Sequence, residues 1–345
     1  MTAAGPTALM DVPVPLTDRF DVALTDLDGV LFRGNEPVPY AAEGVAAARK
    51  AGMRFVFVTN NASRQPKLAA SKLESVRIPA VREDVVTAAE DGVRLMAEHI
   101  EPGSKVLVVG GNGLADAVMR AGFKLVAGAV ERPAAVIQGW SPTLAWRDLE
   151  EAAYAIESGS AYFATNLDKN LPTEFGFAPG NGAMVQAVVV TTGVRPLAAG
   201  KPHASIFHMA AERVAARRPL VVGDRLDTDL AGAINAGYPG MMVLTGVNSA
   251  ADVFMAHPEE RPRLIAAALR ALSQPHLAPV ADSAYWVCGQ ARAWVDGNRL
   301  MVEEPPRAPG EGPSVEAVRA GAAAAWTATD GGVVLERDSI PPQFS

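Results

Sequence analysis

The sequence contains only one cysteine, Cys288, among its 345 residues. No disulfide can therefore form within the chain, and a metal site would have to be built from carboxylates or histidines. A single thiol is typical of a protein that works in a reducing compartment. We therefore predict that the protein is cytoplasmic.

Long apolar segments are also absent. No stretch approaches the roughly 20 apolar residues of a membrane span without a glycine, proline or charge interrupting it. The segment before Val22 has neither a cationic start nor an apolar run long enough for a secretory signal. Its prolines predict a loose arm over residues 1–17. We expect neither export nor insertion into a membrane.

Positive charge is not in excess, because the formal net charge is -7. This balance disfavours binding to polyanions through counterion release, so nucleic acid is not an expected partner, whereas a single phosphate needs only a local basic site. Hydrophobic residues make up 49% and charged residues 20% of the chain, as in ordinary globular proteins. A chain of this length predicts two or more domains.

Short apolar runs alternate with amphipathic stretches from Asp21 onward. The segments DVALTDLDG, AAEGVAAARKAG, MRFVFVTNN and SRQPKLAASKLESV follow one another as strand, helix, strand and helix. Runs such as RFVFV and LVVG are apolar on both faces, as the strands of a parallel sheet covered by helices must be. The sequence therefore predicts an α/β fold.

The pattern changes after Gly246. The segment HPEERPRLIAAALRAL predicts a helix, and AYWVCGQARAWVDGNRLMVEE predicts a hairpin that turns at Asp296 and Gly297. Ser314 is expected to cap a helix over SVEAVRAGAAAAWTA, and GGVVLERD predicts a closing strand. Together these segments predict a small α+β appendage with a boundary near residues 258–276.

Two carboxylates follow the first predicted strand, in Asp26-Leu27-Asp28-Gly29. Residues two apart in extended backbone point the same way, so Asp26 and Asp28 are expected on one side of the sheet edge, where α/β proteins bind ligands. One carboxylate of such a pair can attack phosphorus while the other protonates the leaving group. An ordinary turn after a strand is the alternative interpretation of this motif.

Polar residues also follow the next strand, in Thr59-Asn60-Asn61. A hydroxyl, two amides and free backbone N–H groups before a helix form a natural phosphate cradle. Simple N-capping of that helix is the alternative. Further along, Gly200-Lys201-Pro202 places a lysine where it would supply a positive charge to a phosphate, although most lysines are merely solvated.

A third acidic group follows another apolar strand, in LVVGDRLDTD. Asp224 ends that strand and is expected at the same sheet edge as Asp26 and Asp28. Three acidic groups at one edge need a cation, and Mg²⁺ fits best because it prefers oxygen ligands and keeps several waters. Asp229 is expected to lie outside the set of metal ligands, where it would order those waters or Lys201. The alternative for Asp229 is a partner of the helix dipole.

These four motifs, in this order and each at a strand end, resemble the haloacid dehalogenase superfamily of phosphatases, whose motifs are a DxD loop, a Ser or Thr, a Lys and a GD…D loop. The segments TNNASR, TNLDKNLP, PGNGAMVQA, GKP and GDRLDTD are similar to the subgroup of p-nitrophenyl phosphatases, phosphoglycolate phosphatase and pyridoxal phosphatase. The resemblance covers residues 18–262. It implies a Rossmann-like parallel-sheet core over 18–79 and 196–262 and an α/β cap over 80–195. The predicted C-terminal α+β domain then covers residues 263–345.

The resemblance also implies a role for each motif residue. Asp26 would be the nucleophile and Asp28 the acid/base. Magnesium would be held by Asp26, Asp224 and the main-chain carbonyl of Asp28, with Asp229 behind them. Phosphate would be bound by the polar residues of the second and third motifs, which are Thr59, Asn60, Asn61 and Lys201.

Substrate choice in this subgroup is a property of the cap. Relatives carry a Gly-aromatic-Asp segment where this chain has Gly139-Trp140-Ser141-Pro142, and some carry a histidine where Leu171 stands. The departure removes polar groups, which disfavours pyridoxal phosphate and phosphoglycolate. Trp140, Asn170 and Leu171 are the predicted contacts with the carbon part of the substrate. Ordinary packing within the cap is the alternative for all three.

The whole chain is similar to a group of bacterial phosphatases whose C-terminal domain resembles GNAT acetyltransferases. This resemblance implies D-glycerol 3-phosphate as the substrate and a role in recycling glycerophospholipid polar heads. The C-terminal segment has no [RQ]xxGx[GA] loop of the kind that binds acetyl-CoA, and RAGAAAA around Arg319 has the wrong spacing. We therefore expect no transferase activity.

Other functions remain open at this point. One is a broad activity on small phosphomonoesters of the phosphoglycolate or pyridoxal phosphate type, and another is a phosphotransferase or mutase with the same residues. A third is a sensor that binds a phosphate ligand without turnover, which Asp28 disfavours because a binding site needs no leaving-group acid. The expected partner is a small phosphorylated metabolite, and a homo-oligomer is possible.

Overall fold

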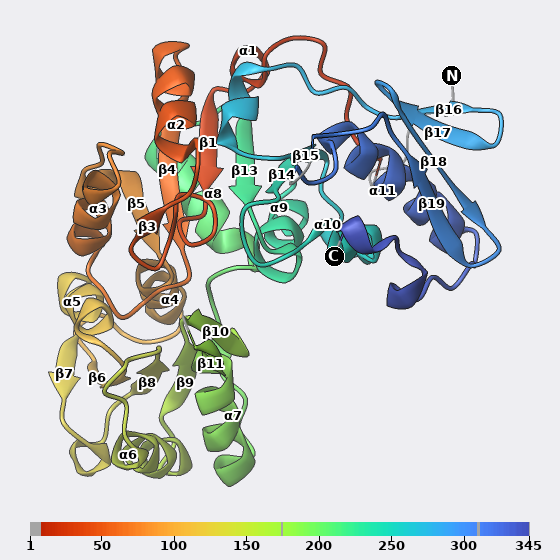
Figure 1. Cartoon of the computed structure of the whole chain (residues 1–345). Coiled ribbons are helices and arrows are strands. Elements are labelled where there is room, and N and C mark those ends of the chain that lie inside the picture. Colours follow the sequence, from red (N-terminus) through yellow and green to blue (C-terminus); the bar gives the residue numbers. More distant parts are fainter. Residues whose placement is uncertain (1–7, 174, 309–310, 345) are drawn as a thin grey trace. The chain divides into compact units, whose positions relative to one another are not determined.

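The computed structural model describes residues 8–173, 175–308 and 311–344 (Figure 1). The chain forms two compact units, one of Met1–Phe55 and Ala215–Ser345 and the other of Val56–Val214. The second unit is therefore an insertion in the sequence of the first. The predicted cap, residues 80–195, lies within the second unit, and the division into core, cap and C-terminal domain stays a prediction.

The first unit contains parallel strands in the order β15, β14, β13 and β1. Strand β1 (Val22–Thr25) pairs with β13 (Pro219–Gly223), which pairs with β14 (Gly240–Val243), which pairs with β15 (Leu264–Ala266). All residues of these strands are buried, which explains why the sequence is apolar without alternation. The predicted parallel α/β core is confirmed.

Short helices and turns complete this part of the unit. The helices are α1 (Leu16–Arg19), α2 (Ala41–Lys50), α9 (Ala231–Asn235) and α10 (Ala250–Phe254). A small hairpin of β2 (Phe32–Arg33) and β3 (Glu36–Pro37) follows the first acidic motif. The turns are 3₁₀ at Pro258–Glu260, Leu269–Ser273, Arg337–Ser339 and Pro342–Phe344, and π-helical at Leu226–Leu230.

The C-terminal segment forms an antiparallel sheet and one long helix. The sheet runs through β16 (Val280–Asp282), β17 (Tyr285–Cys288), β18 (Ala291–Asp296) and β19 (Arg299–Glu303) in sequence order. The predicted turn is confirmed, because Asp296 pairs with Arg299 around Gly297. Helix α11 (Val315–Asp330) begins as predicted, with the Ser314 hydroxyl accepting a hydrogen bond of 3.1 Å from the Ala317 N–H.

Three predictions for local structure are wrong. The helix expected from His257 onward is replaced by a 3₁₀ turn and strand β15, since a short apolar run fits a buried strand as well as a helix and pairing with β14 decides between them. The strand expected at Val333 and Val334 is absent from this described segment. In the predicted loose arm, residues 1–7 lie outside the described part, while Leu16 and Val12 are buried.

Helix α11 shares a hydrophobic core with the parallel sheet of its unit. The Trp326 indole N–H donates 2.8 Å to the carbonyl of Val253, and a side chain on Gly321 would come within 2.8 Å of the Phe254 ring. The buried Arg319 guanidinium donates to the carbonyl of Ile265 in β15. The C-terminal segment therefore covers apolar surface that the edge of the parallel sheet would otherwise expose to water.

The second unit begins within β4 (Arg54–Thr59), which pairs in parallel with β5 (Val85–Thr87). A five-stranded parallel sheet follows, whose order is β12 (Leu197–Ala198), β9 (Ala161–Ala164), β8 (Ala135–Gln138), β6 (Lys105–Val109) and β7 (Lys124–Val126). An antiparallel hairpin is formed by β10 (Asn170–Thr173) and β11 (Gly176–Pro179). The 3₁₀ turns are Arg82–Asp84 and Ala129–Glu131.

Helices cover both faces of the five-stranded sheet. One face packs against α4 (Ala88–Ala97) and α5 (Asn112–Arg120), and the other against α6 (Trp146–Glu157) and α7 (Asn181–Thr192). The unit also contains α3 (Pro66–Ser75) and α8 (Ala204–Arg213). This arrangement explains why the strands between residues 105 and 164 are largely buried and apolar.

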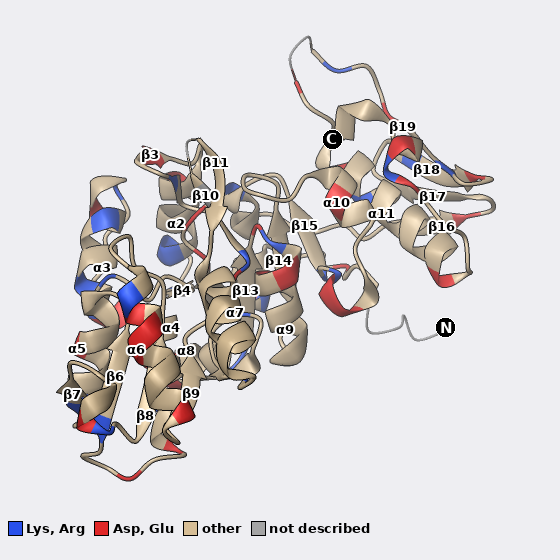
Figure 2. Ribbon diagram, turned by 90° about the horizontal axis from the view of Figure 1, so that it is seen from below, with Lys and Arg blue, Asp and Glu red and all other residues tan. Residues whose placement is uncertain are grey.

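Charged residues do not gather by sign along the chain. Figure 2 shows acidic and basic residues interspersed on the ribbon of each unit. Over the part of the chain that the structure describes, no helix combines the length and the apolar character needed to cross a bilayer. The absence of a nucleic-acid partner stays a prediction, because it follows from net charge alone.

His276 ties the N-terminal segment to the sheet of the first unit. Its Nε2 accepts a hydrogen bond of 3.0 Å from the Ile265 N–H, and its Nδ1 lies 2.7 Å from the carbonyl of Met10. These partners require the neutral ring with the proton on Nδ1. Burial, followed by the charge of Arg319, lowers the pKa of His276 to about 4. Protonation would therefore break the bond to Ile265 and place a charge in the core.

We expect stability to fall as the pH drops from about 6.5 to about 4. The pKa of His276 is lower in the fold than in the unfolded chain, so the unfolded chain binds the proton first and the contribution is fully present only above about pH 6.5. The pKa difference corresponds to about 3 kcal/mol. Urea unfolding of His276→Gln should show a shallower pH slope in this window, while the exposed control His257→Gln keeps the slope. Equal slopes in all three proteins would contradict this assignment.

Candidate active site

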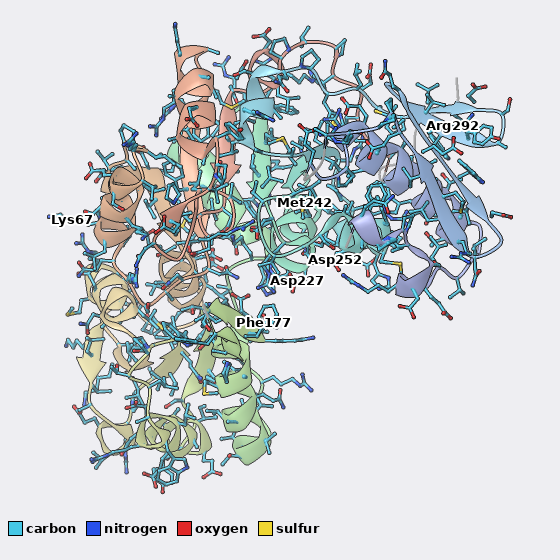
Figure 3. All side chains as sticks on the ribbon, in the orientation of Figure 1. Lys67, Phe177, Asp227, Met242, Asp252 and Arg292 are labelled. Atoms are coloured by element: carbon cyan, nitrogen blue, oxygen red, sulfur yellow. The ribbon has the colours of Figure 1, made fainter. Side chains whose placement is uncertain are left out.

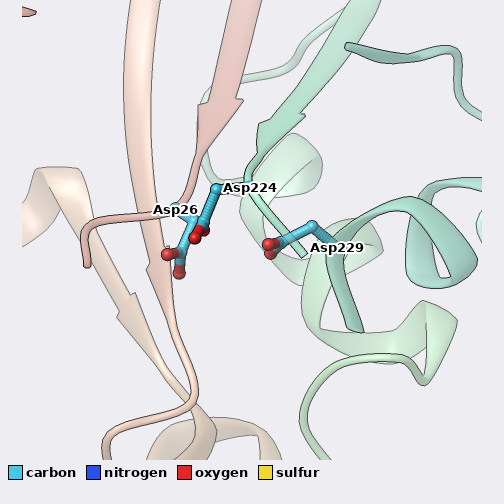
Figure 4. Close-up of side chains that lie close together, drawn as sticks. All are labelled: Asp26, Asp224 and Asp229. Atoms are coloured by element: carbon cyan, nitrogen blue, oxygen red, sulfur yellow. The ribbon is translucent and has the colours of Figure 1, made fainter. Parts of the chain in front are cut away.

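Three carboxylates from two distant stretches of the first unit meet in one place. Asp26, Asp224 and Asp229 each offer an oxygen, and these oxygens all lie within 4.8 Å of one another. Figure 4 shows the three side chains pointing toward a common space. Asp26 directly follows β1 and Asp224 directly follows β13. Because Thr25 and Val222 are paired in the sheet, the residues that follow each strand come together at its carboxyl edge.

Backbone groups and glycines shape the space around Asp224. The Val247 N–H donates 2.7 Å to its Oδ2, and the Asn248 N–H donates 3.2 Å to its carbonyl. A Cβ on Gly29 or on Gly246 would overlap Asp224 Oδ2. Gly29 also has a φ of +80°, which disfavours any other residue. The two loops thus leave a slot that fits this carboxylate and nothing larger.

Asp229 comes from the π-helical turn Leu226–Leu230 rather than from a strand end. Its Oδ2 accepts a hydrogen bond of 3.2 Å from the Arg225 N–H, and a Cβ on Gly223 would overlap its side chain. A π-turn widens the helix and is often found at functional sites. The sequence predicts a position behind the metal for Asp229, whereas the structure places its carboxylate in the same group as Asp26 and Asp224.

Asp28 occupies a different position from the three grouped carboxylates. It is exposed, and its backbone forms a bridge to Phe32 at the start of the β2–β3 hairpin. The Gly29 N–H donates 2.8 Å to the carbonyl of Phe32, and the Thr245 hydroxyl donates 2.8 Å to the carbonyl of Gly29. Asp28 therefore lies two residues after Asp26 on a loop whose backbone is fixed at both sides.

The grouped carboxylates fit a divalent metal ion. Asp224 and Asp229 are 1% and 2% exposed, and burying like charges this close to each other is costly unless a cation compensates them. All three donors are carboxylate oxygens, which magnesium prefers over nitrogen or sulfur ligands. The donor set therefore matches the ion that the sequence predicts.

In the second unit, the side chains of the polar loop after β4 mainly bind one another. The Thr59 hydroxyl accepts 3.1 Å from the Asn61 N–H, and the Asn61 side chain accepts from the N–H and hydroxyl of Ser63. Asn60 donates 3.0 Å to the carbonyl of Lys201 and accepts 2.8 Å from its N–H. Asn60 thus clamps the backbone of the lysine. Phosphate binding by the two amides stays a prediction.

Lys201 is buried although it carries a charge. It is 4% exposed, and its Nζ lies 3.3 Å from the carbonyl of Val58 at the end of β4. Lysine side chains are rarely this buried. The Asn60 side chain holds the backbone of Lys201 through bonds to its carbonyl and its N–H. The structure therefore brings Lys201 together with Thr59 and Asn60, as the sequence predicts for a phosphate site.

Asp168 contacts the predicted phosphate loop, although the motifs did not indicate this residue. Asn60 donates to both of its carboxylate oxygens, at 3.0 and 3.1 Å. Asp168 follows β9, so the rule that polar residues at strand ends build sites would have selected it. It connects the loop after β9 to the loop after β4 within the second unit.

The predicted specificity residues lie on two segments of the second unit. Trp140 follows β8 and is half-buried, while Asn170 and Leu171 open β10 and pair with Pro179 and Ala178 of β11. Strand β11 of this hairpin presents an apolar side chain to solvent, since Phe177, labelled in Figure 3, is 68% exposed. Contact between these residues and a substrate stays a prediction.

We expect Gly246→Ala to abolish metal binding while the protein stays folded. The added methyl would overlap Asp224 Oδ2 and push the carboxylate out of the group. Thermal unfolding with and without magnesium measures this, since an ion that binds only the native protein raises its melting temperature. The control is Gly312→Ala, which meets open space. A magnesium-induced shift of wild-type size in Gly246→Ala would contradict the assignment.

Comparison with known proteins agrees with this geometry. The family model described as haloacid dehalogenase-like hydrolase matches residues 23–124, and the model described as HAD-hydrolase-like matches residues 198–272. D-glycerol 3-phosphate phosphatase of Mycobacterium tuberculosis is 46% identical over 75% of this chain and 72% of its own length.

Solved structures similar to this chain include two phosphatases. Glycerol phosphate phosphatase of M. tuberculosis in complex with magnesium has a TM-score of 0.81 at 41% identity, over 92% of this chain and 93% of that one. The 4-nitrophenylphosphatase of Thermotoga maritima has a TM-score of 0.69 at 28% identity, over 75% of this chain and 98% of that one. The similarity of the C-terminal domain to acetyltransferases stays a prediction.

Proposed function

Because the chain belongs to the haloacid dehalogenase-like hydrolases, we propose that it is a magnesium-dependent phosphatase that releases phosphate from a small phosphomonoester. The proposed substrate is D-glycerol 3-phosphate. The observation that carries the proposal is the group of three carboxylates at the carboxyl edge of the parallel sheet. Such a group suits chemistry on a phosphate, whose negative charge also needs compensation.

We assign the two chemical roles to the first motif. Asp26 attacks the phosphorus through a carboxylate oxygen, and the bond from phosphorus to the alkoxide oxygen breaks as Asp28 gives that oxygen its proton. Asp28 then takes a proton from water, whose oxygen attacks the same phosphorus and releases inorganic phosphate and free Asp26. The exposure of Asp28 suits a group that must exchange protons with solvent.

Magnesium would be held by the carboxylates of Asp26, Asp224 and Asp229 together with the main-chain carbonyl of Asp28. When bound, it neutralises charge on the carboxylates and on the phosphate oxygens. The grouping of Asp229 with the other two carboxylates supports its inclusion in this set.

We assign the phosphate contacts to Thr59 and Lys201, with the backbone N–H group of residue 60. The N–H of Asn61 already donates to the Thr59 hydroxyl. Lys201 supplies the positive charge, and its buried, clamped backbone lets it do so without first becoming ordered. Asn60 acts through Lys201, because its amide is already bonded to the backbone of that residue. Trp140, Asn170 and Leu171 would contact the carbon part of the substrate.

The remaining proposals concern the partner and the location of the protein, and the identity of its substrate. The small phosphorylated metabolite is the proposed partner, and the cytoplasm is the proposed location because the chain has one cysteine. The M. tuberculosis relative supports glycerol 3-phosphate, since it is 46% identical and bears that substrate in its name.

We expect Asp26→Asn to lower phosphate release by at least about 10³-fold, because an amide cannot form the acyl phosphate. Release of inorganic phosphate with magnesium measures this, and Asp227→Asn, on an exposed side chain outside the carboxylate group, is the matched control. Turnover of wild type in ¹⁸O-water should place the label in the phosphate. Unlabelled phosphate, or transfer to an added sugar, would indicate a phosphotransferase. Ligand-induced thermal stabilisation without any phosphate release would indicate a sensor.

The substrate is tested by a panel of small phosphomonoesters at fixed magnesium. We expect the highest kcat/KM with D-glycerol 3-phosphate, and lower values with phosphoglycolate and pyridoxal phosphate, because the segment at Trp140 lacks polar partners for them. A flat profile across the panel would refute the substrate and leave the phosphatase assignment in place.

A further inference from the structure

Asp91 is a buried acid that the proposed chemistry does not use. It lies in the first turn of α4 in the second unit and is 1% exposed. Burial raises the pKa of its carboxyl above the ordinary value, although hydrogen bonds from Gly200 and Ser205 oppose this effect. A buried carboxyl is costly to keep, so its contacts indicate what it does.

Both donors of Asp91 come from the segment around Lys201. The Gly200 N–H and the Ser205 hydroxyl each donate 2.8 Å to the same oxygen, Oδ2. Gly200 immediately precedes Lys201, and Ser205 lies in the first turn of α8. One carboxylate oxygen thus connects α4 to the residues on both sides of the lysine.

The backbone around Lys201 has little room to shift. Gly200 has a φ of +72°, and a Cβ on it would lie 2.5 Å from the carbonyl of Thr165 and 2.8 Å from Asn60 Oδ1. On the following residue, Asn60 accepts from the Lys201 N–H and donates to its carbonyl. Asp91 therefore holds one end of a loop whose other end is held by Asn60.

A lysine has a flexible four-carbon stem, so the position of its ammonium group depends on how firmly its backbone is held. Loss of the bond to Gly200 would release the loop on one side and leave a buried N–H without its partner. The Lys201 ammonium would then have to be ordered by the substrate itself, which weakens phosphate binding.

We infer that Asp91 is a positioning residue for Lys201, whose carboxylate holds the Gly200-Lys201 backbone so that the ammonium group meets the substrate phosphate. The inference rests on the proposed function, in which Lys201 binds that phosphate. Asp91 itself does not contact the substrate in this role. The function of Asp91 is to accept the Gly200 hydrogen bond, which an amide oxygen also does.

The test is a double-mutant cycle in the full-length protein. Phosphate release from D-glycerol 3-phosphate with magnesium is measured for wild type, Asp91→Ala, Lys201→Ala and the double variant. We expect Asp91→Ala to raise KM about tenfold or more with a smaller effect on kcat, because a lost ground-state contact acts on binding. In the Lys201→Ala background the same change should alter kcat/KM by less than about threefold. Equal effects in both backgrounds would overturn the inference.

Conservative and matched variants separate positioning from folding. Asp91→Asn keeps an acceptor for the Gly200 N–H and should restore KM to within about threefold of wild type. Ser205→Ala keeps the Gly200 bond and should leave KM unchanged, as should Glu90→Gln, which removes a neighbouring carboxylate on α4. A KM for Asp91→Asn as high as that for Asp91→Ala would refute the role.

A variant that fails to fold and a wild type without activity would each have a different meaning. Should Asp91→Ala fail to fold, Asp91→Ser takes its place, since its hydroxyl is too short to reach Gly200 and the same rise in KM is expected. If wild type released no phosphate from any phosphomonoester, the proposed function itself would fail. If wild type were active and Asp91→Ala kept the wild-type KM, only the inference about Asp91 would fail.

Discussion

The mutual repulsion of three carboxylates is the constraint on which the site of the first unit depends. Their oxygens lie within 4.8 Å of one another, and two of the three side chains are buried. The surrounding chain accommodates this with backbone N–H donors from Val247 and Arg225 and with glycines where a side chain would not fit. Carboxylate oxygens grouped this closely form a donor set of the kind that magnesium prefers.

The pairing of β1 with β13 brings Asp26 close to Asp224, although the two residues are far apart in the sequence. Thr25 and Val222 are partners in adjacent parallel strands, so Asp26 and the segment leading to Asp224 emerge together at the same edge. The burial of every residue in β1 and β13 stabilises that register, because apolar residues line both faces. The C-terminal helix packs in one hydrophobic core with Met242 of β14 and Ile265 of β15 in the same sheet.

Hydrogen bonds between loops hold the polar residues of the second unit in place. Asn60 binds Lys201 and Asp168, and Asp91 binds Gly200, so four loops and helix ends hold one another. A glycine again allows the close approach, at residue 200. The lysine is therefore ordered through its backbone, which offsets the flexibility of its side chain.

The sequence by itself determined the α/β class, the four motifs at strand ends, the Ser314 cap and the turn at Asp296, because each depends on neighbouring residues or on a repeating pattern. Only the tertiary structure decided that residues 264–266 form a strand, because pairing with β14 overrides a helical pattern. It also decided that the Asp229 carboxylate lies in one group with those of Asp26 and Asp224, that Asn60 holds the backbone of Lys201, and that Asp91 binds Gly200 beside that lysine. Those three assignments depend on which distant groups meet, and no local preference encodes such meetings.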